Sequence, residues 1–382
     1  MGAPFSRTFD ILIVGAGPAG SYLAHLLAHQ GVSVAIIDKE PFPRYKVCGG
    51  GLCLRAVNLL PFDLSSVVED RITSAVVTLK CQTICHKQTQ DPMIYMVSRE
   101  VFDTFLMEKA IMSGANFWDA TALRSVEPLN SAIEIKTSKG AFKTKLIAGA
   151  DGALSKTARL LGLGPAPNLL PAIEAEIAIN DLNLFANYRG CVHFDLAIPP
   201  HGYGWIFPKN DHLSVGVFST RKKERKLKFA LQQYMEHKGL QDSAKLLSLR
   251  GHTIPAGLVT RRHLITKRGL LLGDAAGFAD PITGEGIYHA LAQAELAASC
   301  ILDFLKGDEK SLKRYEKSLF TYFKREHLYA WLLGAFFYKI PALSHRLLRR
   351  HADLITDLHI DVITGQRLYK DLIKIALWLK RP

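Results

Sequence analysis

The sequence predicts an α/β protein, α+β overall, in which a parallel-sheet domain is combined with an antiparallel-sheet domain and a helical C-terminal region. Three observations lead to this fold class. Residues 9–40 run through strand, glycine turn, helix and strand, residues 173–219 carry several short strand-like segments, and residues 302–382 are mostly helical and basic. The 382-residue chain is long enough for two or three structural units.

The N-terminal stretch is organised around a glycine turn. A branched apolar run at residues 11–14 fits a buried parallel strand, and it stops at a G-x-G-x-x-G turn, residues 15–20. A helix over residues 21–30 follows, and the next strand, residues 32–37, is closed by Asp38. Strand, turn, helix, strand and acid in this order are the setting in which the motif indicates a Rossmann-like dinucleotide site.

Each part of this motif has a physical role. Gly15 permits a tight turn, Gly17 lets the backbone approach a pyrophosphate, and Gly20 lets the helix pack closely on the sheet. The helix N-terminus presents N–H groups to an anion, and Asp38 can accept hydrogen bonds from a ribose. The alternative is a glycine-rich helix entry in an unrelated α/β domain.

A second glycine-rich stretch covers residues 40–52. Its two prolines and three consecutive glycines predict a loop, from which Arg44 and Lys46 can face a phosphate. Cys48 precedes the glycines, whose backbone can lie against a flat ring. The alternative for Cys48 is a small buried hydrophobe, which is the usual state of a free cysteine.

We expect a helix from residue 54 to 70 and strands at residues 72–80 and 93–97, joined by a polar hairpin. Cys81 and Cys85 in that hairpin are interpreted as unpaired surface thiols, since no second pair of metal ligands follows them.

A helix starts near Arg99, which either reaches a phosphate or ribose or lies in solvent as a helix-start arginine. A buried strand over residues 144–150 ends in a second turn at Asp151 and Gly152. This turn suits close backbone contact with the same ligand.

Residues 164–251 change character and predict an antiparallel sheet. Tyr203, Trp205 and Phe207 alternate along one of its strands, so they project to one face. That face either packs as core or forms the floor of a tunnel for a long apolar ligand. Residues 221–248 are interpreted as a lysine-dense, helix-rich insertion with solvated charges.

Residues 268–298 are predicted to contribute to the nucleotide site again. They contain a short strand, the segment GDAAG, the segment DPITGEGI and an alanine-rich helix. Asp274 can accept hydrogen bonds from ribityl hydroxyls. The turn at residues 284–287 offers helix N-terminal N–H groups to a flavin C2 carbonyl, where charge develops on reduction.

Composition narrows the class of partner. The net charge of +13 suits an anionic membrane surface or a phosphorylated substrate, and the lack of a Lys/Arg block with interleaved aromatics argues against nucleic acid. Six cysteines without a signal-peptide pattern predict a cytoplasmic protein, and no apolar run is long enough to span a membrane. The C-terminal helices, with Leu347, Arg349, Lys374, Trp378 and Lys380, either rest peripherally on a membrane or cap the substrate sheet.

Three separated elements, GAGPAG with Asp38, the turn at Asp151, and GDAAGFADPITGEGI, together resemble the FAD-dependent oxidoreductases of the p-hydroxybenzoate hydroxylase type. Within that superfamily, PFPRYKVCGGGL and YGWIFP resemble the geranylgeranyl reductase family. We therefore expect a discontinuous FAD-binding domain (1–75, 98–163 and 252–300), a substrate domain (76–97 and 164–251) and a helical C-terminal region (301–382).

The resemblance also implies the site residues. Tyr203, Trp205 and Phe207 would line an isoprenoid tunnel, Cys48 would be catalytic, and no metal is expected. The cofactor-binding residues would be Gly15, Gly17, Pro18, Ala19, Gly20, Asp38, Lys39, Cys48, Gly49, Gly51, Arg99, Ala122, Asp151, Gly273, Asp274, Pro281, Gly284, Gly286 and Ile287.

The activity implied is saturation of the C=C bonds of a prenyl chain carried by a diphosphate, a lipid, a chlorophyll precursor or a quinone. Reduced FAD would deliver hydride from N5, and Cys48 or an ordered water would supply the proton. The electron donor would be NADPH or another reductant. No second G-x-G-x-x-G unit for NADPH is present, and the resemblance implies that such a donor can bind transiently without one. A monomer is expected.

Two alternatives remain open. One is an aromatic monooxygenase or halogenase, although YGWIFP lacks the first tryptophan and the isoleucine of the halogenase W-x-W-x-I-P element. The other is a flavin-binding scaffold at a membrane.

Overall fold

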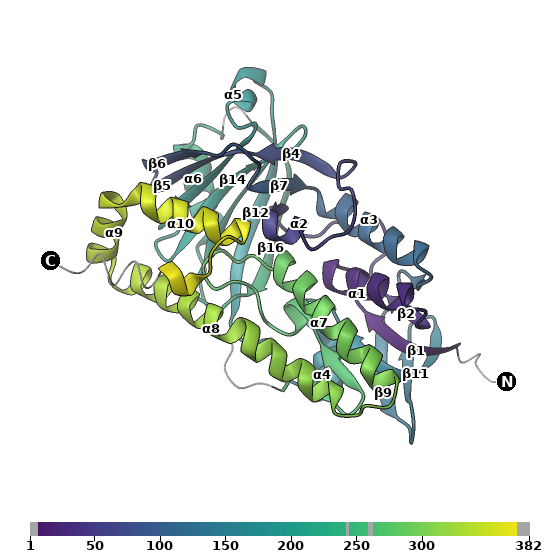
Figure 1. The fold of residues 1–382 in the computed structure, drawn as a ribbon. Coiled ribbons are helices and arrows are strands. Elements are labelled where there is room, and N and C mark those ends of the chain that lie inside the picture. Colours follow the sequence, from purple (N-terminus) through teal and green to yellow (C-terminus); the bar gives the residue numbers. More distant parts are fainter. Residues whose placement is uncertain (1–6, 242–243, 259–262, 373–382) are drawn as a thin grey trace. The chain divides into compact units, whose positions relative to one another are not determined.

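The computed structural model describes residues 7–241, 244–258 and 263–372 (Figure 1). The chain divides into two compact units, each described by itself. Unit 1 comprises Met1–Tyr45, Glu100–Asn168 and Pro255–His327, and unit 2 comprises Lys46–Arg99, Leu169–Ile254 and Leu328–Pro382. This division differs from the expected domain limits, because residues 46–75 belong to unit 2 and the C-terminal region divides after His327.

Unit 1 is built on a mainly parallel sheet with the strand order β17-β18-β11-β1-β2-β8. Parallel pairing places Val14 beside both Ile37 and Gly149, so the carboxyl ends of three strands meet at one edge. The path strands are β1 (Arg7–Val14), β2 (Val34–Ile37), β8 (Asn116–Trp118), β11 (Gly140–Gly149), β17 (Ile265–Thr266) and β18 (Gly269–Leu271). Off this path, β9 (Leu123–Pro128) and β10 (Ile133–Thr137) continue antiparallel from β11.

Helices α1 and α4 lie against this sheet, and α1 and α7 run side by side (Figure 1). Tyr22 on α1 donates a 3.2 Å hydrogen bond to Glu295 on α7. The elements are α1 (Pro18–His29), α3 (Arg99–Met112), α4 (Lys156–Leu160), the 3₁₀ turn η1 (Gly273–Ala275), α7 (Ile287–Leu305) and the first part of α8 (Ser311–Lys339). The predicted strand, glycine turn, helix and strand at the N-terminus are confirmed.

Unit 2 contains a seven-stranded sheet in the order β16-β12-β15-β14-β13-β5-β6, and a three-stranded sheet in the order β3-β7-β4. In the large sheet, β5 runs parallel to β13, whereas β12 with β15, β15 with β14, β14 with β13 and β5 with β6 are antiparallel. The strands are β3 (Gly51–Cys53), β4 (Val68–Ile72), β5 (Ser74–Leu79), β6 (Gln82–Gln88), β7 (Ile94–Val97), β12 (Leu169–Ile179), β13 (Cys191–Leu196), β14 (Gly202–Pro208), β15 (Leu213–Ser219) and β16 (Ala244–Pro255).

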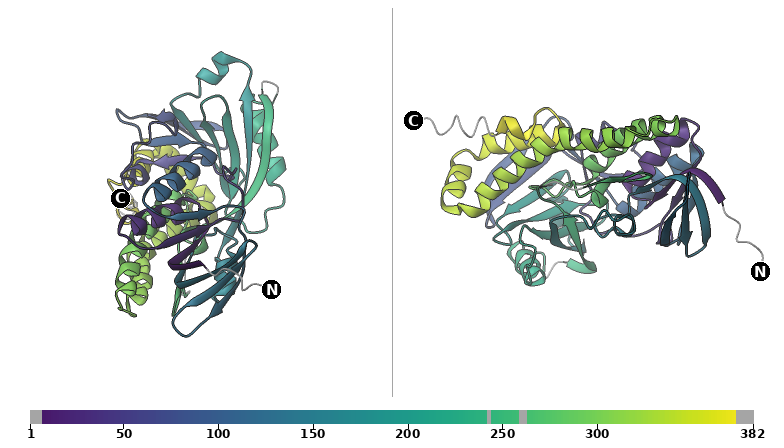
Figure 2. Two further views of the ribbon diagram at one scale, coloured as in Figure 1. Left: turned by 90° about the vertical axis from the view of Figure 1, so that its right-hand side faces the viewer. Right: turned by 90° about the horizontal axis from the view of Figure 1, so that it is seen from below.

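The two faces of the large sheet are covered by different helices (Figure 2). On one face, α6 (Leu227–His237) packs Leu231 and Tyr234 against the core of the sheet. On the other face, α10 (Ala352–Thr364) adds Ile360 to a cluster that includes Met96 of the small sheet. The remaining helices are α2 (Leu54–Val57), α5 (Leu182–Ala186) and α9 (Pro341–Arg350). The C-terminal helix α10 therefore serves as a cap on the large sheet.

Several local expectations are wrong. The helix expected over residues 54–70 ends at Val57, and β4 begins at Val68. The polar segment forms strand β6. Cys85 on this strand is buried, and its thiol donates a 3.4 Å hydrogen bond to Asp353 of α10. The insertion at 221–248 holds α6 and the start of β16.

Across the described residues, none of the helices has the length and apolarity needed to cross a membrane, and Lys374, Trp378 and Lys380 lie outside the described residues.

Candidate functional site

The first glycine turn closes against a second turn of unit 1. Gly15 has φ +102°, and a Cβ atom there would lie 2.4 Å from the carbonyl oxygen of Ala150. A Cβ atom at Gly20 would lie 1.9 Å from the carbonyl oxygen of Gly15. Both positions therefore require glycine, and the turn at Asp151 lies directly beside the first turn.

The N-terminus of α1 is open to an anion. Gly17 is the N-cap residue and supplies no side-chain cap, while Pro18 at the first helical position has no N–H of its own. Ala19 and Gly20 follow in the buried first turn. The backbone N–H groups of this turn are therefore suited to a pyrophosphate.

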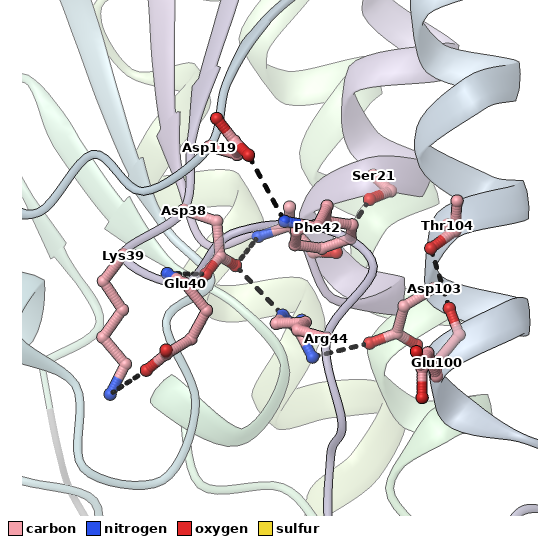
Figure 3. A network of polar contacts seen from close by, with 11 residues as sticks. Ser21, Asp38, Lys39, Glu40, Phe42, Arg44, Glu100, Asp103, Thr104 and Asp119 are labelled. Carbon is pink, nitrogen blue, oxygen red and sulfur yellow. Dashed lines mark hydrogen bonds and ion pairs between the residues drawn. The ribbon is translucent and has the colours of Figure 1, made fainter.

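Asp38 holds the turn from the end of β2 (Figure 3). Its Oδ2 atom accepts a 2.8 Å hydrogen bond from the backbone N–H of Ala16, and its Oδ1 atom accepts one of 3.0 Å from the N–H of Glu40. Arg44 approaches the same carboxylate at 3.5 Å. Because a carboxylate has about four lone-pair sites, one remains for a ribose hydroxyl.

Arg44 connects Asp38 to α3 (Figure 3). Its second contact is a 3.1 Å ion pair with Asp103, whose side chain is fully buried. The structure thus places Arg44 between two carboxylates. Lys39, by contrast, points into solvent and lies 3.8 Å from the exposed carboxylate of Glu40.

The third motif meets the first at Gly273. This residue has φ +62°, and a Cβ atom there would lie 3.0 Å from the Cβ of Ala19. Its N–H donates a 2.9 Å hydrogen bond to Gln293 of α7. Asp274 lies beside the α7 N-cap, since a Cβ atom at Gly286 would be 3.2 Å from its Oδ1.

The turn before α7 contains Pro281 and Gly284 and leads to Ile287, the first residue of the helix. Two acidic side chains shape this turn. Asp280 accepts hydrogen bonds of 2.8 and 2.9 Å from the next backbone N–H groups, those of residues 282 and 283. Glu285 accepts a 2.6 Å hydrogen bond from the N–H of residue 288, in the first turn of the helix. Asp280 is thus a structural residue of this site that sequence reasoning did not include.

Two predicted cofactor residues have local partners. The carboxylate of Asp151 accepts hydrogen bonds from Ser155 and from the N–H and hydroxyl of Thr157, so it caps α4. Both backbone groups of Ala122 pair with Ser138, at 2.9 Å each. Any contact that these residues make with a nucleotide must use their remaining atoms.

Unit 2 carries the predicted aromatic face. Tyr203 lies 6.1 Å from Trp205, and Trp205 lies 6.3 Å from Phe207, between ring centroids. Phe194 on β13 adds a fourth ring, 5.4 Å from Phe207. Phe218 on β15 adds a fifth ring, 5.5 Å from Tyr203. The alternation expected from the sequence therefore produces one continuous aromatic surface on the sheet.

Neighbouring strands make room for Trp205. A Cβ atom at Gly216, directly opposite on β15, would lie 2.1 Å from the indole ring. The indole N–H donates a 3.3 Å hydrogen bond to the Ser214 hydroxyl. These contacts hold the ring flat against the sheet.

The cysteine–glycine loop packs on this aromatic surface. A Cβ atom at Gly49 would lie 2.8 Å from the ring of Phe207 and 3.2 Å from the indole nitrogen of Trp205. The thiol of Cys48 is half-buried and accepts a 3.4 Å hydrogen bond from the N–H of Gly50. Cys48, Gly49 and the aromatic strand therefore form a single site within unit 2, while Gly51 begins β3 and half-buried Arg99 begins α3.

Lys209 anchors the loop. It follows β14 directly and is 2% exposed. Its Nζ donates hydrogen bonds of 2.8 Å to the Gly49 carbonyl and 2.7 Å to the Val97 carbonyl. Sequence reasoning missed this residue because a lysine in a hairpin turn normally lies in solvent.

A hollow of about 590 Å³ opens elsewhere on unit 1, lined by Asp10, Lys143, Lys145 and Arg268, among other residues. It lies beside the first half of β1. Ligands of open α/β sheets bind outside the carboxyl ends of the strands, where the glycine turns meet. The motifs, and not this hollow, mark the cofactor site.

Comparison with known proteins agrees with this geometry. Residues 8–320 match the family model described as FAD binding domain. The chain is 34% identical to an uncharacterised protein of Methanosarcina barkeri, over 89% of this chain and 87% of that protein. It is 30% identical to the chloroplastic geranylgeranyl diphosphate reductase of Arabidopsis thaliana, over 88% of this chain and 76% of that enzyme. The chain belongs to the geranylgeranyl reductase family of FAD-dependent oxidoreductases.

A solved structure supports the same assignment. A geranylgeranyl bacteriochlorophyll reductase-like protein from Thermoplasma acidophilum superposes with a TM-score of 0.77 at 25% identity, covering 86% of this chain and 87% of that one. The predicted resemblance and the predicted α/β class are therefore confirmed.

The residues of unit 1 fit FAD. Glycine at positions 15 and 20 lets the two turns close against each other, and the α1 N-terminus beside them offers backbone donors to the pyrophosphate. Asp38 offers an acceptor to the ribose, and Asp274 lies at the α7 N-cap, where helix N–H groups suit a developing negative charge. Arg44, Asp103 and Gln293 keep these groups in position, and the groups would bind and orient the cofactor.

Proposed function

We propose that this protein is a reductase that saturates C=C bonds in the chain of a prenyl diphosphate or prenylated lipid. The observation that carries the proposal is the packing of Gly49, next to Cys48, on Phe207 and Trp205. This packing puts a polarizable thiol and a broad apolar surface in one site, which is what an alkene within a long hydrocarbon chain requires.

The aromatic face supports binding of such a chain. Five rings on three neighbouring strands form an extended apolar layer, in which Trp205 and Phe218 are buried and Tyr203, Phe207 and Phe194 are half-buried. Each CH₂ group of a chain buried against this layer contributes about 0.8 kcal/mol. A chain of about 20 carbons can therefore bind tightly even after the cost of ordering it. Tyr203, Trp205 and Phe207 would orient the chain and exclude water.

Reduction of an alkene consumes one hydride and one proton and converts the C=C bond to a C–C bond. FAD, when reduced, supplies the hydride. Cys48 would supply the proton from its thiol and regain one from water. The thiol accepts a hydrogen bond from Gly50, which leaves its own S–H hydrogen available as a donor.

Anaerobic turnover tests this proposal. FAD-loaded protein is incubated with dithionite and geranylgeranyl diphosphate, and the product is examined by mass spectrometry. We expect a gain of two mass units per alkene reduced. NADPH in place of dithionite tests the electron donor. A product that appears only with oxygen would instead indicate the monooxygenase or halogenase class, and bound FAD without any product would indicate a scaffold.

The role of Cys48 is tested separately. Cys48→Ala should lower the rate at least tenfold with little change in bound FAD, whereas Cys300→Ala, at a half-buried cysteine of α7, should leave the rate unchanged. If Cys48→Ala kept the full rate and the same products, water and not Cys48 would be the proton source.

A further inference from the structure

The end of α8 and the whole of α9 form an outward surface of unit 2 that combines apolar and basic side chains. Its exposed apolar residues are Trp331 (38%), Leu332 (43%), Ile340 (51%) and Leu343 (42%). Its exposed basic residues are Lys80, Lys339, Arg346, Arg349 and Arg350. We call these nine residues the α8–α9 surface.

The charge of this surface has one sign. Residues 328–350 contain no aspartate or glutamate, and none of the five basic side chains forms an ion pair with any residue that the structure describes. The neighbouring acids Asp353 and Asp357 on α10 are held by Lys87 at 3.5 and 3.0 Å. The pKa of His345 is lowered by burial and by the positive charges of Lys80 and Arg349, which indicates a positive local field.

Helix α9 has one face that packs on α8 and another face, both apolar and basic, that is exposed. Ser344 and Leu348 are buried, and the Ser344 hydroxyl donates a 2.8 Å hydrogen bond to the carbonyl of Phe337, so this face holds the helix to α8. Leu343, Arg346 and Arg350 follow helical spacing on a different face and are exposed.

The remaining basic residues are held close to this surface. The Lys339 ammonium lies 5.9 Å from the Trp331 ring centroid. Arg349 donates a 3.0 Å hydrogen bond to Gln82, at the end of the hairpin that carries Lys80. Trp331 thus lies beside a cation of α8, and Arg349 of α9 lies beside the hairpin that carries Lys80.

We propose that the α8–α9 surface docks on an anionic lipid membrane. Exposed tryptophan and aliphatic side chains favour the membrane interface, and neighbouring lysine and arginine side chains are attracted to acidic headgroups. A second copy of the chain is a poorer occupant, because a twofold contact through this face would set cations against cations. Nucleic acid is also a poorer occupant, because Ile340 and Leu343 would remain uncovered.

The structure changes which residues carry the membrane expectation. Leu347 and Leu348 lie between Arg346 and Arg349 in the sequence, but Leu348 is buried and Leu347 is half-buried. Trp331 and Leu332 of α8, together with Ile340 and Leu343, provide the exposed apolar contact instead. The docking proposal does not depend on the proposed reaction, although a membrane-resident prenyl lipid would give both a common purpose.

Vesicle flotation tests the proposal with full-length, FAD-loaded protein. Vesicles of phosphatidylcholine alone are compared with vesicles containing one quarter phosphatidylglycerol, at low salt and at 0.5 M NaCl. We expect binding to the anionic vesicles that weakens at high salt. Arg346→Glu/Arg350→Glu should lower that binding at least tenfold, and Ile340→Ser/Leu343→Ser should lower it about fivefold.

Matched controls separate this surface from net charge. Lys222→Glu/Lys223→Glu makes the same charge change at exposed positions elsewhere in unit 2 and should keep at least half of the binding. Trp331→Phe should bind while losing the blue shift of tryptophan fluorescence that vesicles induce.

Several outcomes would overturn the proposal. These are no vesicle binding by the natural protein, equal loss in the 222/223 control, complete loss on removal of residues 373–382 with the α8–α9 surface intact, and a dimer that the Arg346/Arg350 variant no longer forms. Binding is measured without turnover, so an inactive but vesicle-binding protein would reject the proposed reaction and retain the docking surface.

Discussion

Each unit contains a glycine loop held by a buried charged side chain, but the charges are opposite. In unit 1 the Asp38 carboxylate accepts a hydrogen bond from the N–H of Ala16, 22 residues earlier. In unit 2 the Lys209 ammonium donates a hydrogen bond to the carbonyl of Gly49, 160 residues earlier. Both charged residues directly follow a strand, so the sheets fix the position of the charge in each case.

The difference shows what each loop presents to its surroundings. A carboxylate takes one N–H of the first turn and leaves the helix N-terminus beside it to attract an anion. In the second loop, the Lys209 ammonium donates hydrogen bonds to the carbonyls of Gly49 and Val97. These bonds fix the loop through its carbonyl groups, and Gly49 packs on the ring of Phe207. The first loop leaves backbone donors that suit a phosphate, whereas the second loop keeps Cys48 at a fixed place on an apolar face.

The strongest way to break the first half of this comparison is Asp38→Ala. The change removes two backbone hydrogen bonds and leaves the buried guanidinium of Arg44 with Asp103 alone. We expect unfolding free energy to fall by about 3–5 kcal/mol, as for other broken buried pairs, and FAD content to fall sharply. Denaturant unfolding and the ratio of absorbance at 450 and 280 nm measure the two effects.

Asp119→Ala is the matched control, because half-buried Asp119 accepts one 3.3 Å hydrogen bond from the Phe42 N–H and lies 3.7 Å from Lys139, whose side chain is largely exposed. It should cost less than about 1 kcal/mol and keep the normal FAD content. If both variants retained FAD equally, Asp38 would not be the residue that shapes the turn.

The second half of the comparison is sharpened by Lys209→Met, which keeps side-chain length but removes the charge. The Gly49 and Val97 carbonyls would lose their donor while remaining buried, so we expect a loss of about 1–3 kcal/mol. The loop should also move more freely, and alkylation of Cys48 by iodoacetamide, followed by peptide mass spectrometry, should become at least threefold faster.

Lys238→Met distinguishes loop anchoring from general destabilisation. Lys238 forms a 2.9 Å ion pair with buried Asp195 on the α6 side of the same sheet, so its loss destabilises unit 2 without touching the loop. Cys48 alkylation should keep its natural rate in this variant under native conditions. Equal acceleration in both lysine variants would contradict the anchoring role of Lys209.

The sequence predicted the first loop better than the second for a physical reason. Strand, turn, helix and acid of the first loop are consecutive, so their spacing alone reports the geometry. Lys209 follows a strand of the seven-stranded sheet, and Gly49 precedes a strand of the three-stranded sheet. Their contact depends on how distant strands pair, and residue spacing within one segment does not report that. Alternation did predict that Tyr203, Trp205 and Phe207 share a face, because period-two geometry is local.

Ion-pair partners were likewise beyond local reasoning. The sequence allowed Arg44 to face a phosphate but did not indicate its ion pairs with Asp38 and Asp103, the latter a helical residue with no distinguishing sequence context. The short α2 shows the same limit, since apolar residues after Val57 pack under tertiary control instead of extending the helix. Sequence thus reports motifs and faces, while the residues that hold motifs in place come from long-range packing.

The smallest expected effect concerns the hairpin that carries Lys209. The backbone N–H of Lys209 donates a 2.8 Å hydrogen bond to the carbonyl of His212, whose ring contacts Glu176 at 3.0 Å. Burial lowers the pKa of His212, but hydrogen bonds to Glu176 and Asp211 raise it more, so the net pKa lies above the ordinary 6.5. Protonated His212 therefore stabilises the hairpin fully below pH 6.5, and this stability is lost as pH rises through the raised pKa.

His212→Gln should accordingly lower the unfolding free energy by about 1–2 kcal/mol at pH 6 and by less at pH 9, measured by denaturant titration at both values. His237→Gln, at an exposed position near the end of α6, should give no such pH-dependent difference. A His212→Gln effect that grew with pH would mean that neutral His212 is the stabilising form. The positive charge of His212 would then not contribute to the stability of the hairpin that holds Lys209.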